Sequence, residues 1–264
     1  MTAPASAATA STTAAASTIS TTAGAGVDEL ADAFLSATRS RHAFEDCVER
    51  LATAIRLGVY PLGSVLPPER ELAVRLGVSR ATLREAIAAL RAADMVSTTR
   101  GRGGGTVVEH RPTTPGTPGG TPLGARRDKL LDSLTFRRVV EPGACQLAAS
   151  RRLSTAQREL LDDSLQAVLT APDPAEHRQA DSRLHLSIAT STGSAQLVQA
   201  VTGVQADLHD MLIAIPVLEV NIEHSSTQHT AIVGAILGGD GARARREMEN
   251  HCDDTAALLR GLLR

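Results

Sequence analysis

An aspartate and three histidines in the C-terminal half of the chain have the types and the spacing of metal ligands. Asp181 and His185 are four residues apart, so a helix would place both side chains on one face. His229 and His251 lie on opposite sides of the helix-breaking pair Gly238-Gly239, at similar distances from it. With a rise of about 1.5 Å per residue, two antiparallel helices would bring these imidazoles to within roughly 3 Å of the same height. The four side chains could therefore converge inside a helical bundle.

Such a convergence would create a site for a metal. One carboxylate and three imidazoles form an N₃O donor set that suits a divalent transition metal. The alternative is that each histidine is a surface residue or a hydrogen-bonded core residue, which is the commoner role of a histidine in a helix. We assign that role to the remaining histidines, His42, His110, His177, His209 and His224. Residue types and spacing alone leave the metal site and its alternative open.

A second group of reactive side chains lies at the start of a short helix. Residues 66–91, LPPERELAVRLGVSRATLREAIAALR, indicate two helices joined by a tight turn. Gly77 suits the positive φ that ends the first helix, and Ser79 suits the N-cap of the second. Arg80 and Arg84 are four residues apart, on a different face from the apolar positions of that helix. This pattern favours a helix-turn-helix whose second helix enters the major groove of DNA. The alternative is a solvated helix with ordinary surface arginines.

The flanking segments favour the first interpretation. Before the motif, apolar residues at helical spacing predict an amphipathic helix: Phe44, Val48, Leu51 and Ile55. After it, residues 95–99 and 106–109 indicate two short strands around a basic, glycine-rich tip. Such a tip can approach a phosphate backbone or enter a minor groove. Three helices followed by a two-stranded wing predict a winged helix.

Residues 41–109 resemble the DNA-binding domain of the GntR superfamily through IRLGVYPLGSVLPPERELAVRLGVSRATLREAIAALRAADMV and RGRGGGTVV. One departure is Asp94, which stands where relatives usually have glycine, but aspartate tolerates turn conformations. The resemblance implies contacts to phosphates and guanine edges from Arg70, Arg80 and Arg84, contacts to phosphates from Ser79 and Thr82, and a wing tip at Gly103.

The distribution of charge supports a DNA-binding N-terminal half. The chain has 27 Lys and Arg against 29 Asp and Glu, a formal net charge of −2. Residues 39–111 contain 12 Arg and 8 Asp or Glu, a local balance of 12 − 8 = +4. The positive excess therefore coincides with the helix-turn-helix, as binding to phosphates requires.

Composition excludes several other classes of protein. Three scattered cysteines, Cys47, Cys145 and Cys252, argue for a reducing compartment and against a disulfide framework or a zinc finger. The absence of Trp and the scarcity of other aromatics argue against stacking on single-stranded nucleic acid. No apolar run is long enough for a membrane span, and no secretory signal is visible. We therefore expect a cytoplasmic protein without a membrane partner.

The reactive residues belong to two predicted domains of a mainly α-helical chain. We expect a disordered Ala/Ser/Thr-rich tail over residues 1–38 and a winged helix-turn-helix over residues 39–110. A Pro/Gly linker over residues 111–124 then precedes an all-α antiparallel bundle over residues 125–264. The helices of this bundle are expected near residues 125–150, 154–170, 174–191, 195–215, 219–237 and 240–262.

The predicted bundle resembles the FCD effector domain of FadR-type GntR regulators. The resemblance rests on residues 136–150, 180–194, 226–240 and 244–252. It implies that Asp181, His185, His229 and His251 bind a divalent metal, with zinc preferred and nickel or manganese as alternatives. It also implies that a small carboxylate effector completes the coordination and that Arg137 anchors this effector, since a guanidinium binds carboxylates bidentately. The structural alternative is that Arg137 or Arg138 pairs with Glu141 on the same helix.

The sequence thus predicts a metabolite-responsive transcriptional regulator, with repression preferred. We expect a homodimer on a palindromic operator, because two-fold protein symmetry matches such a site. Two alternatives remain: a metal-dependent hydrolase joined to a DNA-binding domain, and an architectural DNA-binding protein that senses no effector. Against an enzyme, no H-E-x-x-H or similar motif supplies a general base beside the metal, and no catalytic residue is predicted.

Overall fold

The fold was obtained as a computed structural model, which describes residue 1 and residues 43–99, 105–112, 127–212 and 219–262. The predicted tail over residues 1–38 lies outside the described residues except for residue 1, as do the wing tip at Gly103 and most of the predicted linker. The same holds for residues 213–218, at the end of the helix predicted over residues 195–215.

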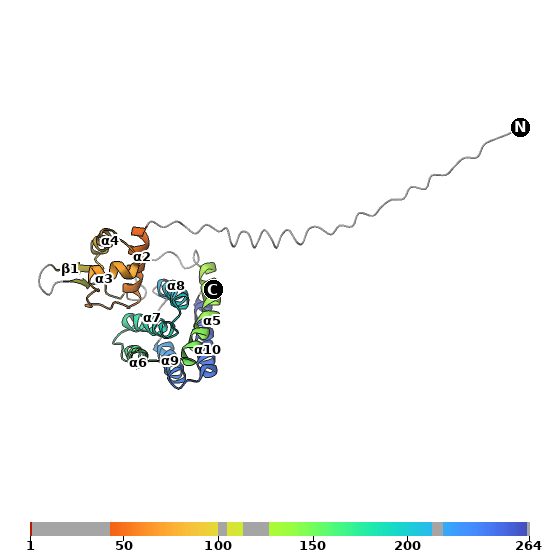
Figure 1. The fold of residues 1–264 in the computed structure, drawn as a ribbon. Coiled ribbons are helices and arrows are strands. Elements are labelled where there is room, and N and C mark those ends of the chain that lie inside the picture. The colour runs from red at the N-terminus through yellow and green to blue at the C-terminus, as the bar shows by residue number, and fades with distance from the viewer. Residues whose placement is uncertain (2–42, 100–104, 113–126, 213–218, 263–264) are drawn as a thin grey trace. The chain divides into compact units, whose positions relative to one another are not determined.

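The N-terminal part of the described chain is a winged helix (Figure 1). The two short strands pair antiparallel, with Val96 opposite Val108 and Thr98 opposite Thr106. Buried Leu51, Leu83 and Leu90 join the strand valines in one apolar core beneath the helices. The prediction of three helices and a wing is confirmed. The elements are α2 (Ala43–Arg56), α3 (Glu69–Leu76), α4 (Arg80–Ala92), β1 (Val96–Thr98) and β2 (Thr106–Val108).

Local residue chemistry sets the geometry of the helix-turn-helix. Gly77 ends α3 with φ 70°, a left-handed conformation that costs glycine little. The Ser79 hydroxyl accepts a hydrogen bond from the backbone N–H of Thr82, so Ser79 is the N-cap of α4 as predicted. Asp94 also has a positive φ, 55°, which fits its expected tolerance of a turn. These three positions fix the angle at which α4 leaves the turn and the start of the wing.

The C-terminal part is a bundle of helices, and the described bounds agree with the predicted ones to within one residue, apart from the start of α5 and the end of α8, which border residues outside the described ranges. In this bundle α5 packs against α10 and α8, α7 packs against α6 and α8, and α9 packs against α10. Pro142 lies inside α5, where it removes one backbone donor from the helix. The helices are α5 (Arg127–Ala149), α6 (Thr155–Leu169), α7 (Pro174–Ser191), α8 (Ala195–Leu212), α9 (Glu219–Leu237) and α10 (Gly241–Leu262).

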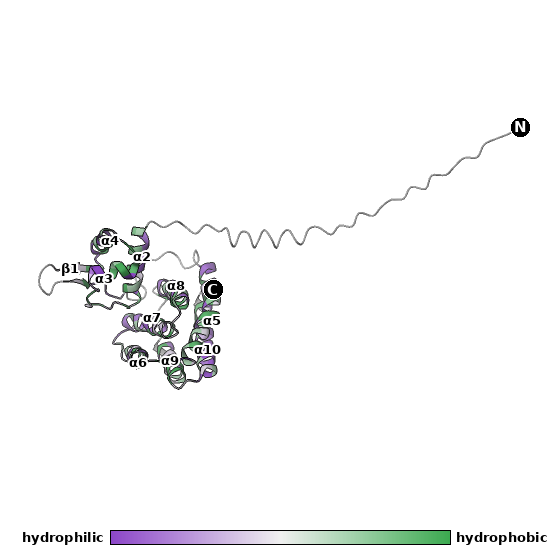
Figure 2. Ribbon diagram, in the orientation of Figure 1, coloured by the Kyte–Doolittle hydropathy of each residue, from purple (hydrophilic) through white to green (hydrophobic). Residues whose placement is uncertain are grey.

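Apolar side chains of the bundle helices pack into separate clusters, two of which join helices near the candidate site. One cluster includes Leu161, Leu184 and Ile232, contributed by α6, α7 and α9. A second cluster joins Leu134 of α5 to Leu259 of α10. Polar and apolar residues both occur along α5 and α10, as expected of helices with one buried and one solvated face (Figure 2). Within the described ranges no helix is both long and apolar enough to cross a membrane.

Candidate functional site

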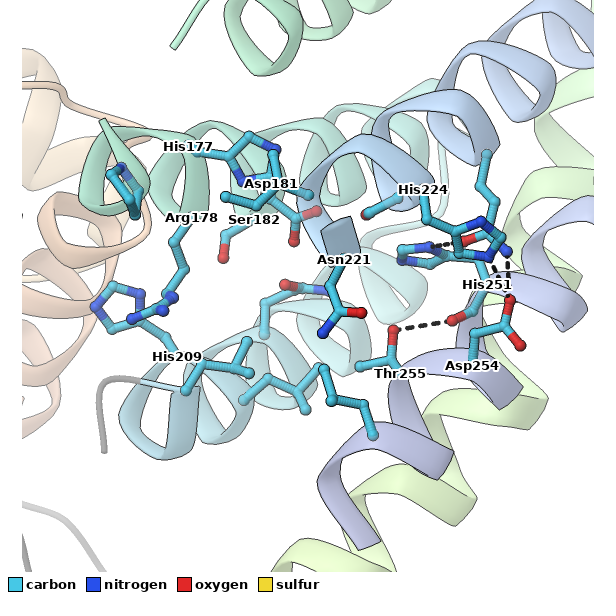
Figure 3. A pocket seen from close by; sticks show the side chains of 18 of the residues that line it. His177, Arg178, Asp181, Ser182, His209, Asn221, His224, His251, Asp254 and Thr255 are labelled. Atoms are coloured by element: carbon cyan, nitrogen blue, oxygen red, sulfur yellow. Dashed lines mark hydrogen bonds and ion pairs between the residues drawn. The ribbon is translucent and has the colours of Figure 1, made fainter. Parts of the chain in front are cut away.

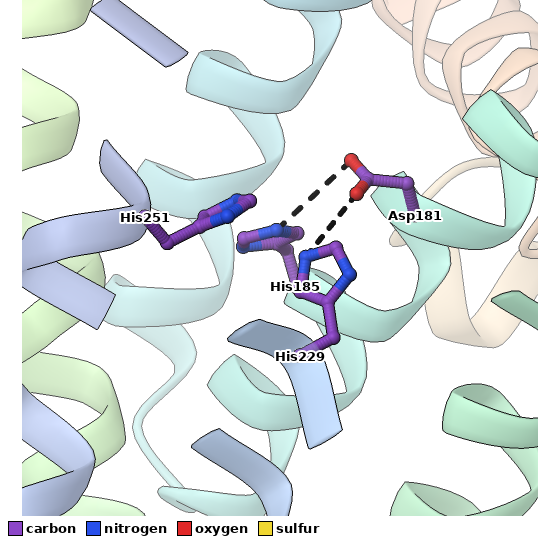
Figure 4. Close-up of side chains that lie close together, drawn as sticks. All are labelled: Asp181, His185, His229 and His251. Carbon is purple, nitrogen blue, oxygen red and sulfur yellow. Dashed lines mark ion pairs between the residues drawn. The ribbon is translucent and has the colours of Figure 1, made fainter. Parts of the chain in front are cut away.

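The aspartate and the three histidines singled out in the sequence lie together inside the bundle (Figure 4). Asp181 and His185 come from α7, His229 from α9 and His251 from α10. One donor atom from each of the four residues lies within 4.8 Å of the other three. Asp181 Oδ1 is 3.3 Å from His229 Nε2, and the rings of His229 and His251 have centroids 4.6 Å apart. The folded chain therefore brings all four predicted metal ligands to one point.

Burial sets the protonation of this cluster. The side chains of His185 and His229 have no exposed surface, and the Asp181 side chain is 20% exposed. Burial lowers the pKa of His229 to about 4 and that of His251 well below its ordinary value. Burial would raise the pKa of Asp181, but His229 and His185 nearby bring it below its usual value. At neutral pH the cluster thus has an ionised carboxylate and at least two neutral imidazoles, the forms that bind metals.

Buried Glu141 of α5 orients His185. Its Oε2 lies 2.9 Å from His185 Nδ1, while Arg137 Nε donates to it at 3.0 Å and Gln205 Nε2 donates to Oε1 at 2.7 Å. Because the paired carboxylate only accepts, it favours the His185 tautomer with hydrogen on Nδ1 and a free Nε2 toward Asp181. Such a carboxylate–histidine arrangement commonly supports metal-binding histidines.

Gln228 of α9 plays the same part for His251. The Gln228 amide donates from Nε2 to Asp254 at 2.7 Å, which fixes the amide orientation. Its Oε1 lies 3.0 Å from His251 Nδ1, and an amide oxygen can only accept, so His251 Nδ1–H donates. His251 Nε2 is therefore left with its lone pair free. Sequence reasoning missed both orienting residues, since neither stands at helical spacing from the histidine that it orients.

A divalent metal fits this donor set. A tetrahedral centre with bonds of about 2.0–2.1 Å places its donors roughly 3.3 Å apart, close to the separation of Asp181 Oδ1 and His229 Nε2. Neither ring nitrogen of His229 has a hydrogen-bond partner among the described residues, although both are buried. Buried polar atoms without partners are rare and costly, and a metal would satisfy one of them. The cluster could hold a metal after small side-chain rotations.

Arg137 has the structural role that was weighed as an alternative. Its guanidinium pairs with Glu141, and both side chains are 2% exposed. Arg138 instead pairs with Glu249 and Asp253 at the surface. One nitrogen of Arg137, Nη1, is buried without a hydrogen-bond partner in the described part of the chain, and Arg137 lines the cavity beside the metal cluster. The predicted contact of Arg137 with an effector remains a prediction.

A cavity of about 170 Å³ adjoins the cluster (Figure 3). Asp181 and His251 lie in its wall, so a molecule in the cavity could reach a bound metal. His177 and His209 also line it, and each has one buried ring nitrogen without a partner among the described residues. The sequence placed these two histidines at ordinary surface or core positions and did not predict that they share a cavity wall. Their spacing in the sequence gave no sign of a shared cavity, because they come from different helices.

The residues predicted to bind DNA occupy an exposed face of α3 and α4. Arg70, Ser79, Arg80 and Arg84 are exposed, and Thr82 is half-buried. Arg84 Nε pairs with Glu69 at 2.7 Å, whereas Arg70 and Arg80 have no ion-pair partner within the described ranges. An exposed pair contributes only about 0–1 kcal/mol, so Arg84 could exchange Glu69 for a phosphate at little cost. Gly103 lies outside the described residues, and its predicted role stays a prediction.

Comparison with known families matches both parts of the chain. Residues 44–108 match the family described as bacterial regulatory proteins, gntR family. Residues 132–254 match the FCD domain. The two matches cover the winged helix and the bundle that holds the cluster of Asp181 and the three histidines.

Individual proteins agree with the family matches. A Mycobacterium gastri protein named as an HTH-type transcriptional regulator, RmpR, is 34% identical over 77% of this chain and 75% of its own. An Escherichia coli K12 protein named as a regulatory protein of the L-lactate dehydrogenase operon is 32% identical over 80% of this chain and 84% of its own. The solved structure of E. coli McbR/YncC, 15% identical, has a similar fold, with a TM-score of 0.50 over 85% of this chain and 100% of that one.

Proposed function

Because this chain belongs to the GntR family of DNA-binding transcriptional regulators and has an FCD domain, we propose that it is a repressor controlled by a small carboxylate bound beside a metal in its bundle. The chain is a regulator and not an enzyme, in agreement with the names of its relatives. The observation that carries the proposal is the convergence of Asp181, His185, His229 and His251 at one point beside a cavity whose wall includes Asp181 and His251.

In this proposal the winged helix binds operator DNA. The start of α4 would enter the major groove, where Arg80 and Arg84 would contact guanine edges or phosphates. Arg70, Ser79 and Thr82 would contact the backbone and fix the position of the helix. The exposure of Arg70, Ser79, Arg80 and Arg84 supports this role. We propose residues 39–110 as the DNA-binding domain.

The bundle, residues 125–264 in this proposal, would bind the effector and form the homodimer. The four ligands would hold a divalent metal, with zinc preferred because imidazole nitrogens and carboxylate oxygens in a four-coordinate set suit it. When bound, such a metal supplies a Lewis-acidic site for one carboxylate group. Arg137 would donate to the same carboxylate from Nη1, which the pairing with Glu141 leaves unused.

Control of DNA binding requires that the effector distinguish two states of the dimer. A ligand with equal affinity for both states shifts nothing, however tightly it binds. We propose that the carboxylate stabilises an arrangement of the bundle helices in which the two winged helices no longer match the two halves of a palindromic operator. The name of the E. coli relative refers to the L-lactate dehydrogenase operon, and L-lactate is a small carboxylate of the proposed kind.

Operator binding measured with and without zinc and small acids tests the proposal. The expected result is that an acid lowers operator affinity of the zinc-loaded dimer and has no effect on the metal-free protein. Indifference of operator affinity to every acid that binds would overturn effector control and favour an architectural DNA-binding protein. Retention of zinc by a His229→Ala variant at full occupancy would overturn the ligand assignment.

A further inference from the structure

The cavity beside the metal cluster has a second cationic end. Figure 3 shows Arg178 and His209 at one end, opposite His224, His251 and Asp254 at the other. Arg178 belongs to α7, three residues before Asp181 and seven before His185, so all three share one face of the helix. The same helix therefore supplies one candidate metal ligand, Asp181, and one guanidinium to the wall of the cavity.

The guanidinium of Arg178 has no anionic partner among the residues that the structure describes. Arg178 takes part in none of their ion pairs, and its Nη1 is buried without a hydrogen bond. Burial lowers the pKa of Arg178, and the coulombic effect of Asp181 offsets this only in part. A half-buried cation whose Nη1 is shielded from water and has no partner is costly, so its presence in a cavity wall points to an anionic ligand group.

The charges around the cavity can be balanced group by group. Arg137 is neutralised by Glu141, and Asp254 is half-exposed at the end of the cavity opposite Arg178, where solvent screens its charge. A divalent ion held by Asp181 would keep one positive charge, which one carboxylate would cancel. The charge of Arg178 then remains, and a second anionic group is needed to cancel it.

We propose that the effector is a short dianion, a dicarboxylate, which places one carboxylate at the metal and Arg137 and the other at Arg178. This inference rests on the proposed function of the cavity and specifies its ligand class. His177 and His209, with buried unpartnered ring nitrogens in the same wall, would donate or accept hydrogen bonds at the Arg178 end. The cavity volume of about 170 Å³ suits a small molecule, since a cavity of about 150 Å³ accommodates benzene.

Calorimetric titration of the zinc-loaded full-length protein with succinate and butyrate tests the proposal. Both acids have four carbons, and only succinate has a second carboxylate. Succinate is expected to bind at least about tenfold more tightly than butyrate, because the loss of one partner from a buried charge pair weakens binding strongly. L-Malate and L-lactate provide the corresponding comparison for hydroxy acids.

Variants at position 178 assign the preference to this side chain. Arg178→Gln is expected to lose the preference for succinate and to leave butyrate affinity unchanged within about twofold, whereas Arg178→Lys is expected to retain part of the preference. Arg183→Gln is the matched control, since Arg183 lies on the same helix but not in the wall of this cavity. Zinc content and thermal unfolding verify that each variant is folded.

The possible outcomes separate this inference from the function on which it rests. Equal binding of succinate and butyrate, or an unchanged succinate affinity in Arg178→Gln, would overturn the dianion and leave control by a monocarboxylate in place. Failure of every acid to bind the zinc-loaded protein would overturn both. A succinate preference that Arg178→Gln abolishes and Arg183→Gln retains would support the proposal.

Discussion

The face of α4 and the cluster of Asp181 and three histidines in the bundle both concentrate ionisable side chains, but in opposite surroundings. Arg80 and Arg84 are exposed, and the one ion pair between Arg84 and Glu69 is solvated. The imidazoles of His185 and His229 are fully buried and surrounded by oriented carboxylates and amides. Water screens the arginines and lets them exchange partners, whereas burial lowers the pKa of His229 and His251 and keeps these two imidazoles neutral. The first surface suits reversible contact with a polymer, and the second suits a stable ion.

This difference in exposure predicts that a buried ion pair and an exposed ion pair contribute unequally to the free energy of unfolding. Arg137–Glu141 and Arg243–Glu247 have the same i,i+4 spacing, but the first pair is buried and the second is exposed. Glu141→Gln is expected to lower the free energy of unfolding by about 3–5 kcal/mol, because it leaves Arg137 buried without a counter-charge. Glu247→Gln is expected to lower it by less than about 1 kcal/mol. Urea unfolding of the metal-free proteins measures both, and equal losses would contradict the contrast.

The next largest effect is expected at a metal ligand. His229→Ala should weaken zinc binding by more than about 100-fold, since even residues that only orient a ligand contribute about 10–100-fold. Thr230→Ala is the matched control on α9, because Thr230 follows His229 directly, is exposed, and donates its side-chain hydrogen bond only to the backbone of its own helix at Ser226. Competition with a chromogenic chelator measures both affinities. Operator binding of the metal-free His229→Ala protein should equal that of the metal-free wild type.

The sequence predicted best those features that depend on neighbouring residues. The N-cap at Ser79, the glycine at the end of α3 and the ligand pair Asp181 and His185 follow from spacing within one turn of helix. The bounds of the bundle helices followed from their breaking residues. The convergence of His229 with His251 was predictable because a short turn joins their two helices.

Contacts between helices distant in the sequence could not be predicted in the same way. Glu141 was recognised as a partner for Arg137 at i,i+4, but its contact with His185 depends on how α5 packs against α7. The same reason explains why His177 and His209 were assigned to ordinary positions. A polar residue on a helix gives no sign of which other helix it will face, so cavities are visible only after packing.

On the exposed side, loss of one arginine is expected to weaken operator binding moderately. Arg80→Ala should cost about 1–3 kcal/mol if it contacts a guanine edge, with relaxed specificity at one base pair. If it contacts only a phosphate, binding to all DNA sequences should weaken. The slope of the logarithm of the binding constant against the logarithm of the salt concentration should then become shallower by about one. Arg91→Ala, at the other end of α4, is the matched control. Fluorescence anisotropy distinguishes a guanine contact from a phosphate contact. The measurement uses a DNA site selected by the wild-type protein, over a range of salt concentrations.

The smallest effect separates the two roles of Ser79. Its hydroxyl caps α4 through the Thr82 N–H, and it also faces outward at the point where DNA would approach. Ser79→Ala should lower the stability of the winged helix by about 1 kcal/mol through loss of the cap. Ser79→Asp should restore that stability, because a carboxylate caps as well as a hydroxyl, yet it should weaken operator binding because it adds a negative charge beside the phosphates. If both variants lost DNA affinity only in proportion to their stability, Ser79 would be a cap alone, and the DNA-contacting face would begin at Arg80.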